Sequence, residues 1–353
     1  MRWQQNKYYL FSFVIIVTSL RSGNLCIGQT DQNTGTSELG IELQKGTKLV
    51  FAEVEEAKKR LATKDDFVKS LSRFDRSSRM KTDKHVSEKE FLQYIANQVR
   101  PWTVDEKERV RAAVESVASQ LMRFELNLPQ TILLIKTTGK EEGGAAYCRP
   151  NAIVLPQNIL IQQTIGLEKL LIHELFHILS ANNPKLKEAL YEVINFKKCD
   201  SIEPPDKIRE IKITNPDAPK NDHYIEVQYK NSFINIVPII YSSAPKYDVK
   251  KGGEFFRYLR INLLAIEKVD KKWQYKRANN GEPVLLELRD VPDYFNKIGM
   301  NTGYIIHPEE ILAENFVLMV QGIQQFKSKW VIERMQNLLQ RDVSKTPVKP
   351  RAK

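Results

Sequence analysis

The residues with the clearest chemical potential form the pentapeptide HELFH at positions 173–177. The 353-residue chain has only five histidines, and two of them, His173 and His177, lie here four positions apart. The segment from residue 167 to residue 180 is rich in residues that favour a helix. Residues four apart on a helix lie on one face, so both imidazoles can bind one zinc ion at the usual Zn–N distance of about 2.0–2.1 Å.

Glu174 supplies a second chemical function. It projects about 100° round the helix from His173, so it can reach a water molecule on the metal without being a ligand. Zinc lowers the pKa of a bound water to about 7, and a neighbouring carboxylate can pass its proton to a leaving amine. The alternative is a buried helix with two satisfied histidines, which would place the Glu174 charge among apolar residues at a cost. The motif therefore predicts a zinc site with a general base.

This HExxH motif resembles the active-site helix of the zincin metallopeptidases. In that superfamily the helix follows a helix and strands, and an extended substrate lies along an edge strand. Residues 104–180 show a similar order of expected elements: helix, strand, strand, then the helix with the histidines. The resemblance implies an α+β fold with a zincin-like catalytic core, in which residues 145–156, AAYCRPNAIVLP, supply the edge strand.

A catalytic zinc ion needs a third protein ligand and an open position for water. The residues after His177, ILSANNPKLKE, lack the glycine and third histidine of the metzincins. Gluzincins, typified by thermolysin, instead use a glutamate on a later helix and an acid one turn further on. In HPEEILAENF, Pro308 can begin a helix, and Glu310 and Glu314 would share one face.

The resemblance to gluzincins implies Glu310 as the third ligand and Glu314 as the partner of the free ring nitrogen of His173. Other acids with suitable spacing stay open as the ligand: Glu309, Glu188 and Glu192. The 133-residue separation of His177 and Glu310 departs from thermolysin-like enzymes, in which the third ligand follows within a few dozen residues. The HPEE sequence also resembles that of uncharacterised secreted bacterial proteins.

Gluzincins often stabilise the tetrahedral intermediate with a tyrosine or a histidine. Tyr304 and His307 directly precede the expected ligand helix, and His223 is a more distant candidate. The resemblance implies Tyr304 and His307 as catalytic residues. Each also has a structural interpretation, Tyr304 as a core aromatic residue and His307 as a neighbour of the helix start.

The rest of the chain predicts alternating helical and strand-rich regions. Residues 49–103 are helical in pattern, with a capping box at Ser87 and Glu90. Residues 104–196 form the expected core, and an amphipathic helix after Pro101 opens it. Residues 197–300 predict a β-rich insertion between the metal ligands, and residues 301–340 predict C-terminal helices.

The two ends are expected to lie outside the folded part. Arg2 and Lys7 precede an uncharged run of 13 residues, which is short of the ~20 that a transmembrane helix needs. Residues 1–28 therefore predict a cleaved signal peptide and a secreted or periplasmic protein. Residues 29–48 predict a flexible lead-in, and residues 341–353 predict a disordered basic tail.

Charge and cysteine content limit the function further. The net charge of +11 falls to +8 without residues 1–28. Most of this charge is expected to be solvated surface, and electrostatic contact with anionic envelope surfaces is the alternative. No nucleic-acid motif accompanies this charge, so no specific nucleic-acid partner is expected. Cys148 and Cys199 would remain and can pair, but neither belongs to a CxxC motif, which argues against a thiolate metal site.

The expected function is that of a secreted zinc metallopeptidase that hydrolyses amide bonds in a peptide or protein substrate, with Glu174 as general base. The alternative is a non-catalytic, zinc-containing protein that binds an envelope polymer or another polyanion. An intact Glu174 favours the enzyme, because a structural zinc site usually closes with a fourth protein ligand. Oligomeric state, cleavage specificity and a possible inhibitory prosegment stay open.

Overall fold

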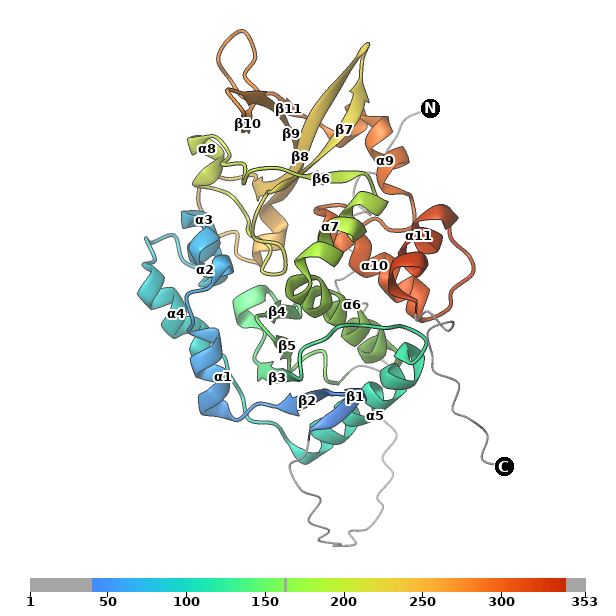
Figure 1. The fold of residues 1–353 in the computed structure, drawn as a ribbon. Helices are drawn as coiled ribbons and strands as arrows, with labels where there is room; N and C mark the ends of the chain where they lie inside the picture. Colours follow the sequence, from blue (N-terminus) through green and yellow to red (C-terminus); the bar gives the residue numbers. More distant parts are fainter. Residues whose placement is uncertain (1–39, 162–163, 341–353) are drawn as a thin grey trace, which may run out of the picture.

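The computed structural model describes residues 40–161 and 164–340 (Figure 1). The expected signal peptide, most of the expected lead-in and the expected basic tail lie outside the described residues. The described part has an α+β fold with two β-sheets, as the sequence predicted at the level of fold class. None of its helices is both long and apolar enough to cross a membrane.

The first sheet has five strands and mixed direction. Its strands, in spatial order, are β1 (Ile41–Gln44), β2 (Thr47–Phe51), β3 (Thr131–Thr137), β5 (Ala152–Pro156) and β4 (Tyr147–Arg149). The three central strands are parallel, and β1 and β4 are antiparallel edge strands. Both faces of the sheet are apolar, so Leu134 belongs to one hydrophobic cluster and its neighbour Ile135 to another on the opposite face.

Two sequence-based expectations for this sheet need correction. The flexible lead-in is wrong from residue 41 to residue 48, because β1 and most of β2 occupy these positions. The stretch is polar, but antiparallel pairing of β1 with β2 buries Ile41, Leu43 and Leu49 against the core. Residues 145–156 form two strands rather than one, so only β4 is the edge and β5 lies inside the sheet.

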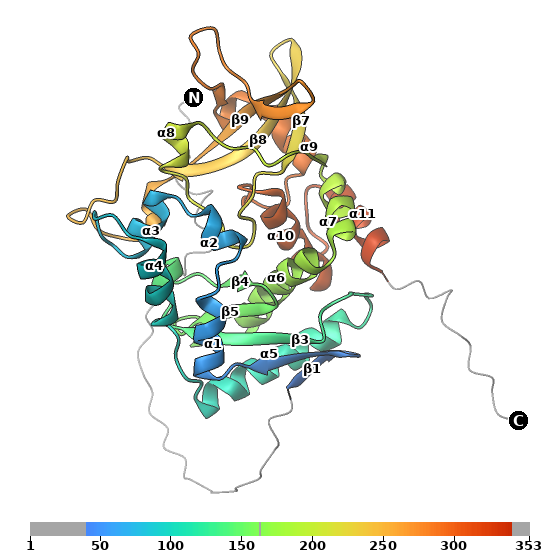
Figure 2. The same cartoon turned by 60° about the vertical axis from the view of Figure 1, so that its left-hand side comes forward.

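Helices cover both faces of the first sheet (Figures 1 and 2). One face carries the N-terminal helices α1 (Val54–Leu61), α2 (Asp66–Ser70) and α4 (Glu88–Ala96), with α3 (Arg73–Arg79) beside them. The other face carries α5 (Val104–Leu121) and α6 (Thr164–Asn182). The predicted capping box at Ser87 and Glu90 is confirmed, as is the buried valine face of the helix after Pro101.

The second sheet is antiparallel and follows α6 in the sequence. Its strands, in spatial order, are β10 (Lys272–Tyr275), β9 (Leu259–Val269), β8 (Ser232–Ser242), β7 (His223–Tyr229) and β6 (Phe196–Lys198), with β11 (Leu285–Leu286) paired to β9. One face joins the main core through Ile225 and Leu263, and the other packs on α8 (Asp206–Arg209) through Ile208. The strand β9 begins at Leu259, directly after the 3-10 turn of Phe255–Tyr258.

The remaining helices are α7 (Pro184–Val193), α9 (Pro292–Ile298), α10 (Pro308–Val320) and α11 (Lys329–Leu339). α7 and α10 pack on α6, α11 packs on α7 and α10, and α9 packs on β7. In both views α6 lies between the two sheets, with α7 and α10 next to it (Figures 1 and 2). Residues far apart in the sequence, on α6 and α10, are therefore brought together in the interior.

Candidate metal centre

Two apolar helices, α6 and α10, carry the residues of the candidate site. The apolar residues of α6 from Leu170 to Leu179 are buried, and so are nearly all residues of α10, which is the pattern of helices enclosed by other elements. As predicted, α10 begins at Pro308, where the missing amide proton of proline is harmless. The His307 Nδ1 atom accepts the backbone N–H of Glu309 at 3.1 Å and so caps this helix.

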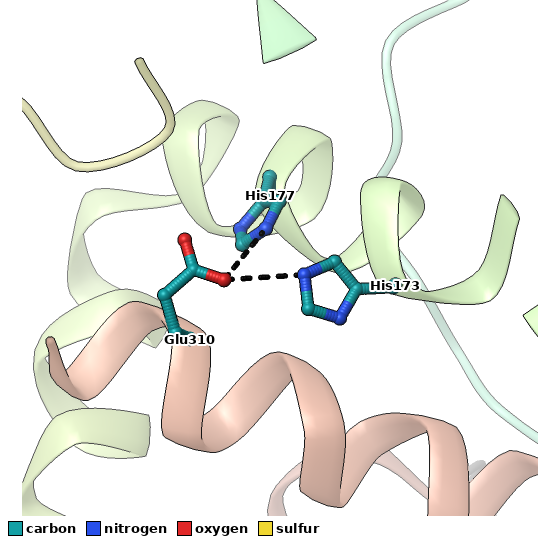
Figure 3. Close-up of side chains that lie close together, drawn as sticks. All are labelled: His173, His177 and Glu310. Carbon is teal, nitrogen blue, oxygen red and sulfur yellow. Dashed lines mark hydrogen bonds and ion pairs between the residues drawn. The ribbon is translucent and has the colours of Figure 1, made fainter. Parts of the chain in front are cut away.

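The packing of α6 on α10 brings the two histidines to Glu310 (Figure 3). The Oε2 atom of Glu310 lies 3.2 Å from His173 Nε2 and 3.7 Å from His177 Nε2. Ligand atoms at about 2.1 Å from a tetrahedral zinc ion are roughly 3.4 Å apart, so this spacing suits such an ion. The three side chains are fully enclosed, with relative exposures of 3%, 3% and 1%.

The other nitrogen of each imidazole faces a second carboxylate. His173 Nδ1 lies 3.2 Å from Glu314 Oε1, and His177 Nδ1 lies 3.2 Å from Glu309 Oε1. Ser180 donates a 2.8 Å hydrogen bond to Glu309, and Tyr191 donates another. Such partners fix the orientation and tautomer of metal-binding histidines, which directs both Nε2 atoms toward the same point.

The charges and unmatched atoms of the site fit a divalent cation. His177 Nε2 is buried and has no hydrogen-bond partner among the described residues, although such an atom normally has one. Glu174, Glu309 and Glu310 are each at most 3% exposed, and buried carboxylates need compensating positive charge. Burial lowers the pKa of His173, but hydrogen bonds to Glu310 and Glu314 outweigh it and raise this pKa to about 9. The neighbouring carboxylates thus favour positive charge at this point of the site.

Glu174 lies beside these ligands in a small cluster with Cys148 and Asp217, and the three possible ligand atoms are within 4.8 Å of one another. The thiol of Cys148, on β4, donates a 3.3 Å hydrogen bond to Glu174 Oε2. Burial raises the pKa of Glu174, an effect opposed by His177 and His173. Within the described ranges Glu174 belongs to no ion pair, so its carboxylate is not neutralised by lysine or arginine.

Several of these residues were not singled out from the sequence. Asp217 and Asn215 lie on a loop of the insertion, and the amide of Asn215 donates a 2.5 Å hydrogen bond to Glu310 Oε1. Asp217 accepts the backbone N–H of Cys148 at 2.7 Å. No motif marks these contacts in the sequence, because each joins residues 69 or more positions apart. Cys148 and Cys199 are both buried free thiols and do not pair.

The other predicted site residues lie at different distances from the ligands. The ring of Tyr304 stacks on that of His173 with centroids 6.3 Å apart, and burial raises its pKa well above the ordinary value. Burial lowers the pKa of His307 to about 4, so this helix-capping ring is neutral at pH 7. His223 and Glu188 pair with each other at 3.1 Å behind Tyr191, apart from the two ligand histidines.

The third ligand can be tested by metal content. We expect Glu310→Ala to lose stoichiometric zinc. Glu309→Gln should bind zinc about 10–100-fold more weakly, because Glu309 meets His177 at Nδ1 rather than at the nitrogen that faces Glu310. Glu188→Ala is the matched control and should bind zinc as the wild type does. Competition with a chromophoric chelator gives the three affinities, and loss of zinc in Glu188→Ala alone would contradict this assignment.

Comparisons with known proteins add no family assignment. No protein-family model matches the sequence, and neither a curated protein nor a solved structure shows significant similarity. The basis for a functional assignment is therefore the site itself.

Proposed function

We propose that this protein is a secreted zinc-dependent metallopeptidase that hydrolyses amide bonds with Glu174 as general base. The observation that carries the proposal is the convergence of two imidazole nitrogens and one carboxylate oxygen, with a further unpaired carboxylate beside them. The pattern of residues 1–28 supports export from the cytoplasm.

His173, His177 and Glu310 would hold the zinc ion. Three protein ligands are the usual number at a catalytic zinc, because one position must stay open. When bound, zinc would polarise both a water molecule and the scissile carbonyl group. Glu309, Glu314 and Asn215 would keep the ligands oriented through the hydrogen bonds described above.

Glu174 would move the proton. Its carboxylate is enclosed and held by the Cys148 thiol, so it is oriented without being paired to a cation. A carboxylate in this position can take a proton from the attacking water and deliver it to the nitrogen of the leaving amine.

Tyr304 would donate to the developing oxyanion. Burial, together with the surrounding carboxylates, raises its pKa, so the phenol keeps its proton at neutral pH. Its ring lies next to that of His173, with centroids 6.3 Å apart and an angle of 24° between the planes. A neutral hydroxyl that donates where negative charge develops stabilises a transition state more than a ground state.

The arrangement of elements supports a zincin-like core. The helix α5, the parallel strands β3 and β5, the antiparallel edge strand β4 and the helix α6 follow the order that the HExxH resemblance implies. An open pocket of about 490 Å³ reaches His177 and Cys148, so substrate would approach between α6 and β4. Pockets of this size suit a small ligand or a short piece of peptide.

Metal removal and return test this function. We expect the purified protein to contain about one zinc ion per chain, to lose peptide hydrolysis on dialysis against a chelator, and to regain it with stoichiometric zinc. A mixture of short peptides analysed by mass spectrometry detects the hydrolysis. Zinc binding without cleavage of any peptide would instead favour the non-catalytic alternative.

A further inference from the structure

A loop of the chain itself closes one end of the candidate cleft. This closing segment, residues 214–219, runs past β4 and touches the site twice. Its Asn215 contacts the ligand Glu310, and its Asp217 accepts the outward-facing N–H of Cys148 at 2.7 Å. On an antiparallel edge strand only alternate residues direct their N–H groups outward, so Asp217 occupies the β4 donor with which an extended peptide would pair.

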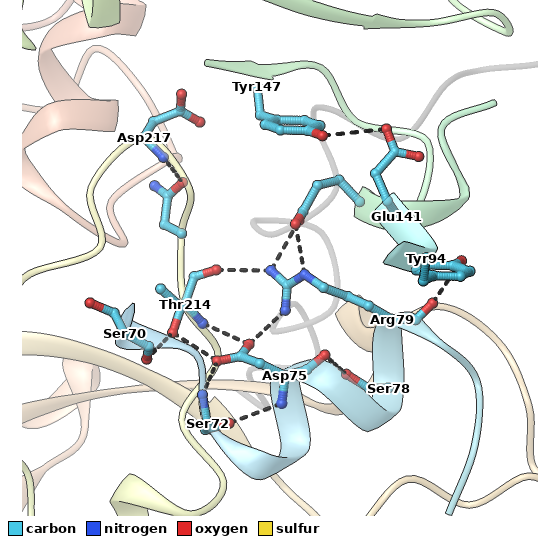
Figure 4. Close-up of polar contacts among 12 residues, drawn as sticks. Ser70, Ser72, Asp75, Ser78, Arg79, Tyr94, Glu141, Tyr147, Thr214 and Asp217 are labelled. Atoms are coloured by element: carbon cyan, nitrogen blue, oxygen red, sulfur yellow. Dashed lines mark hydrogen bonds and ion pairs between the residues drawn. The ribbon is translucent and has the colours of Figure 1, made fainter. Parts of the chain in front are cut away.

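The closing segment is fixed in place by a buried ionic network (Figure 4). Its first residue, Thr214, accepts from Arg79 Nη2 at 2.9 Å through its carbonyl and donates to Asp75 from both its backbone and its hydroxyl. Arg79 also pairs with Asp75 at 2.6 Å and with Glu142 at 2.7 Å, and its side chain is 0% exposed. This network therefore holds the segment that carries Asp217 beside β4.

Asp217 is also the exception among the acids of the adjacent pocket. The other carboxylates that line it have basic partners: Asp65 contacts Arg149, Asp66 contacts Lys220, and Asp222 contacts Lys198. Within the described residues Asp217 forms no ion pair, and its half-buried side chain faces the pocket within 4.8 Å of Glu174. The pocket thus presents one carboxyl group without a basic partner next to the proposed base. Burial, together with Glu174 and Glu310, raises the pKa of Asp217 well above its ordinary value, so a cationic group of a ligand would supply the charge that stabilises its carboxylate form.

We infer that Asp217 binds a primary ammonium group of the substrate, namely the free α-ammonium at the start of a peptide chain. This inference rests on the proposed peptidase function and assigns to it the removal of residues from the N-terminus. Because Asp217 already accepts the N–H of Cys148, a bound peptide could not pair with β4 at this position. In the first residue of a peptide, the α-nitrogen lies only roughly 2.5 Å from the carbonyl carbon that would be attacked. An ammonium group bound by Asp217 would therefore place this carbonyl close to Glu174.

The test compares three peptides of otherwise identical sequence with the zinc-loaded full-length protein. The first has a free N-terminus, the second is acetylated, and the third is acetylated with lysine as its first residue. We expect the first to be shortened from its N-terminus, with kcat/KM about 10–100-fold above that of either acetylated peptide, since a hydrogen bond to a charged group is lost. In Asp217→Asn this preference should shrink at least tenfold, while in Asp66→Asn, the matched pocket control, it should persist.

Each other outcome has a distinct meaning. Equal cleavage of free and acetylated peptides by the wild type, or cleavage at internal bonds, would contradict an ammonium site at Asp217. The proposed peptidase function would still hold. Cleavage restored by lysine shows that a side chain rather than the chain end is bound. Increased internal cleavage in Asp217→Asn would show that the closing segment inhibits the site instead. If Asp217→Asn does not fold, the comparison of the three peptides with the wild-type protein still tests the ammonium site. If the wild type hydrolyses none of the peptides, the proposed peptidase function is rejected.

Discussion

Replacing Glu174 with glutamine should lower kcat/KM for peptide hydrolysis by about 10²–10⁴-fold while leaving zinc bound. Glutamine has nearly the same shape and keeps a hydrogen-bonding oxygen for Cys148, but it cannot accept and return a proton. His173, His177 and Glu310 are unaltered, so the variant should contain as much zinc as the wild type. Single-turnover hydrolysis and metal analysis on the same preparation measure both quantities.

A second substitution on the same helix controls for indirect effects. Glu168 lies on α6 away from the ligands, with only a 3.4 Å hydrogen bond from Gln120 to its carboxylate. We expect Glu168→Gln to keep full activity and full zinc content. Wild-type activity in Glu174→Gln would show that Glu174 is not the general base. Loss of zinc in that variant would show that Glu174 binds the metal or orients a metal ligand.

Replacing Arg79 with methionine should destabilise the fold by about 3–5 kcal/mol, because it leaves two buried carboxylates without their cation. Burial alone would lower the pKa of Arg79, but Glu142 and Asp75 overcome that effect and raise it, so the guanidinium stays charged. Arg79 joins α3, the 3-10 turn η1 (Lys140–Glu142) and Thr214, so its loss should also loosen the closing segment. Urea denaturation measures the stability, and limited proteolysis near residue 214 reports on the segment.

An exposed ion pair provides the comparison for Arg79. Lys58 and Glu55 form an i,i+3 pair on α1 at 2.7 Å, with side-chain exposures of 40% and 85%. Lys58→Met should change the stability by less than about 1 kcal/mol, because water screens such pairs. If Arg79→Met were as stable as Lys58→Met, the buried network would not hold the closing segment.

Local features of the sequence predicted the elements that carry the ligands. The helical spacing of His173 and His177 places both on one face of α6, and Pro308 marks the start of α10. Glu310 and Glu314, one turn apart on α10, both lie against His173, one at each ring nitrogen. The shared face of the residues on each helix was predictable because it depends only on the regular geometry of a helix, whereas their contacts depend on how α10 packs on α6.

Other features depended on pairing that no local pattern shows. The β1–β2 hairpin was not predicted, because its polar residues are typical of a loop. Pairing within the sheet nevertheless buries the apolar residues of the hairpin. Glu309 was an open alternative for the third ligand because adjacent residues differ by about 100° on a helix, and the choice depends on how α10 faces α6. Its contact with the outer nitrogen of His177 appears only in the packed structure.

The sequence by itself determined the types of the candidate ligands, their helical spacing and the presence of a carboxylate beside them, since these follow from residue chemistry and a 3.6-residue turn. Only the tertiary structure decided that Glu310 meets the two histidines, although the second sheet lies between them in the sequence. The same holds for the contact of Asp217, on a loop between α8 and β7, with the edge strand β4. Such contacts are set by the packing of distant apolar surfaces and by the buried Arg79 network. That packing is a property of the whole core, which short-range patterns do not encode.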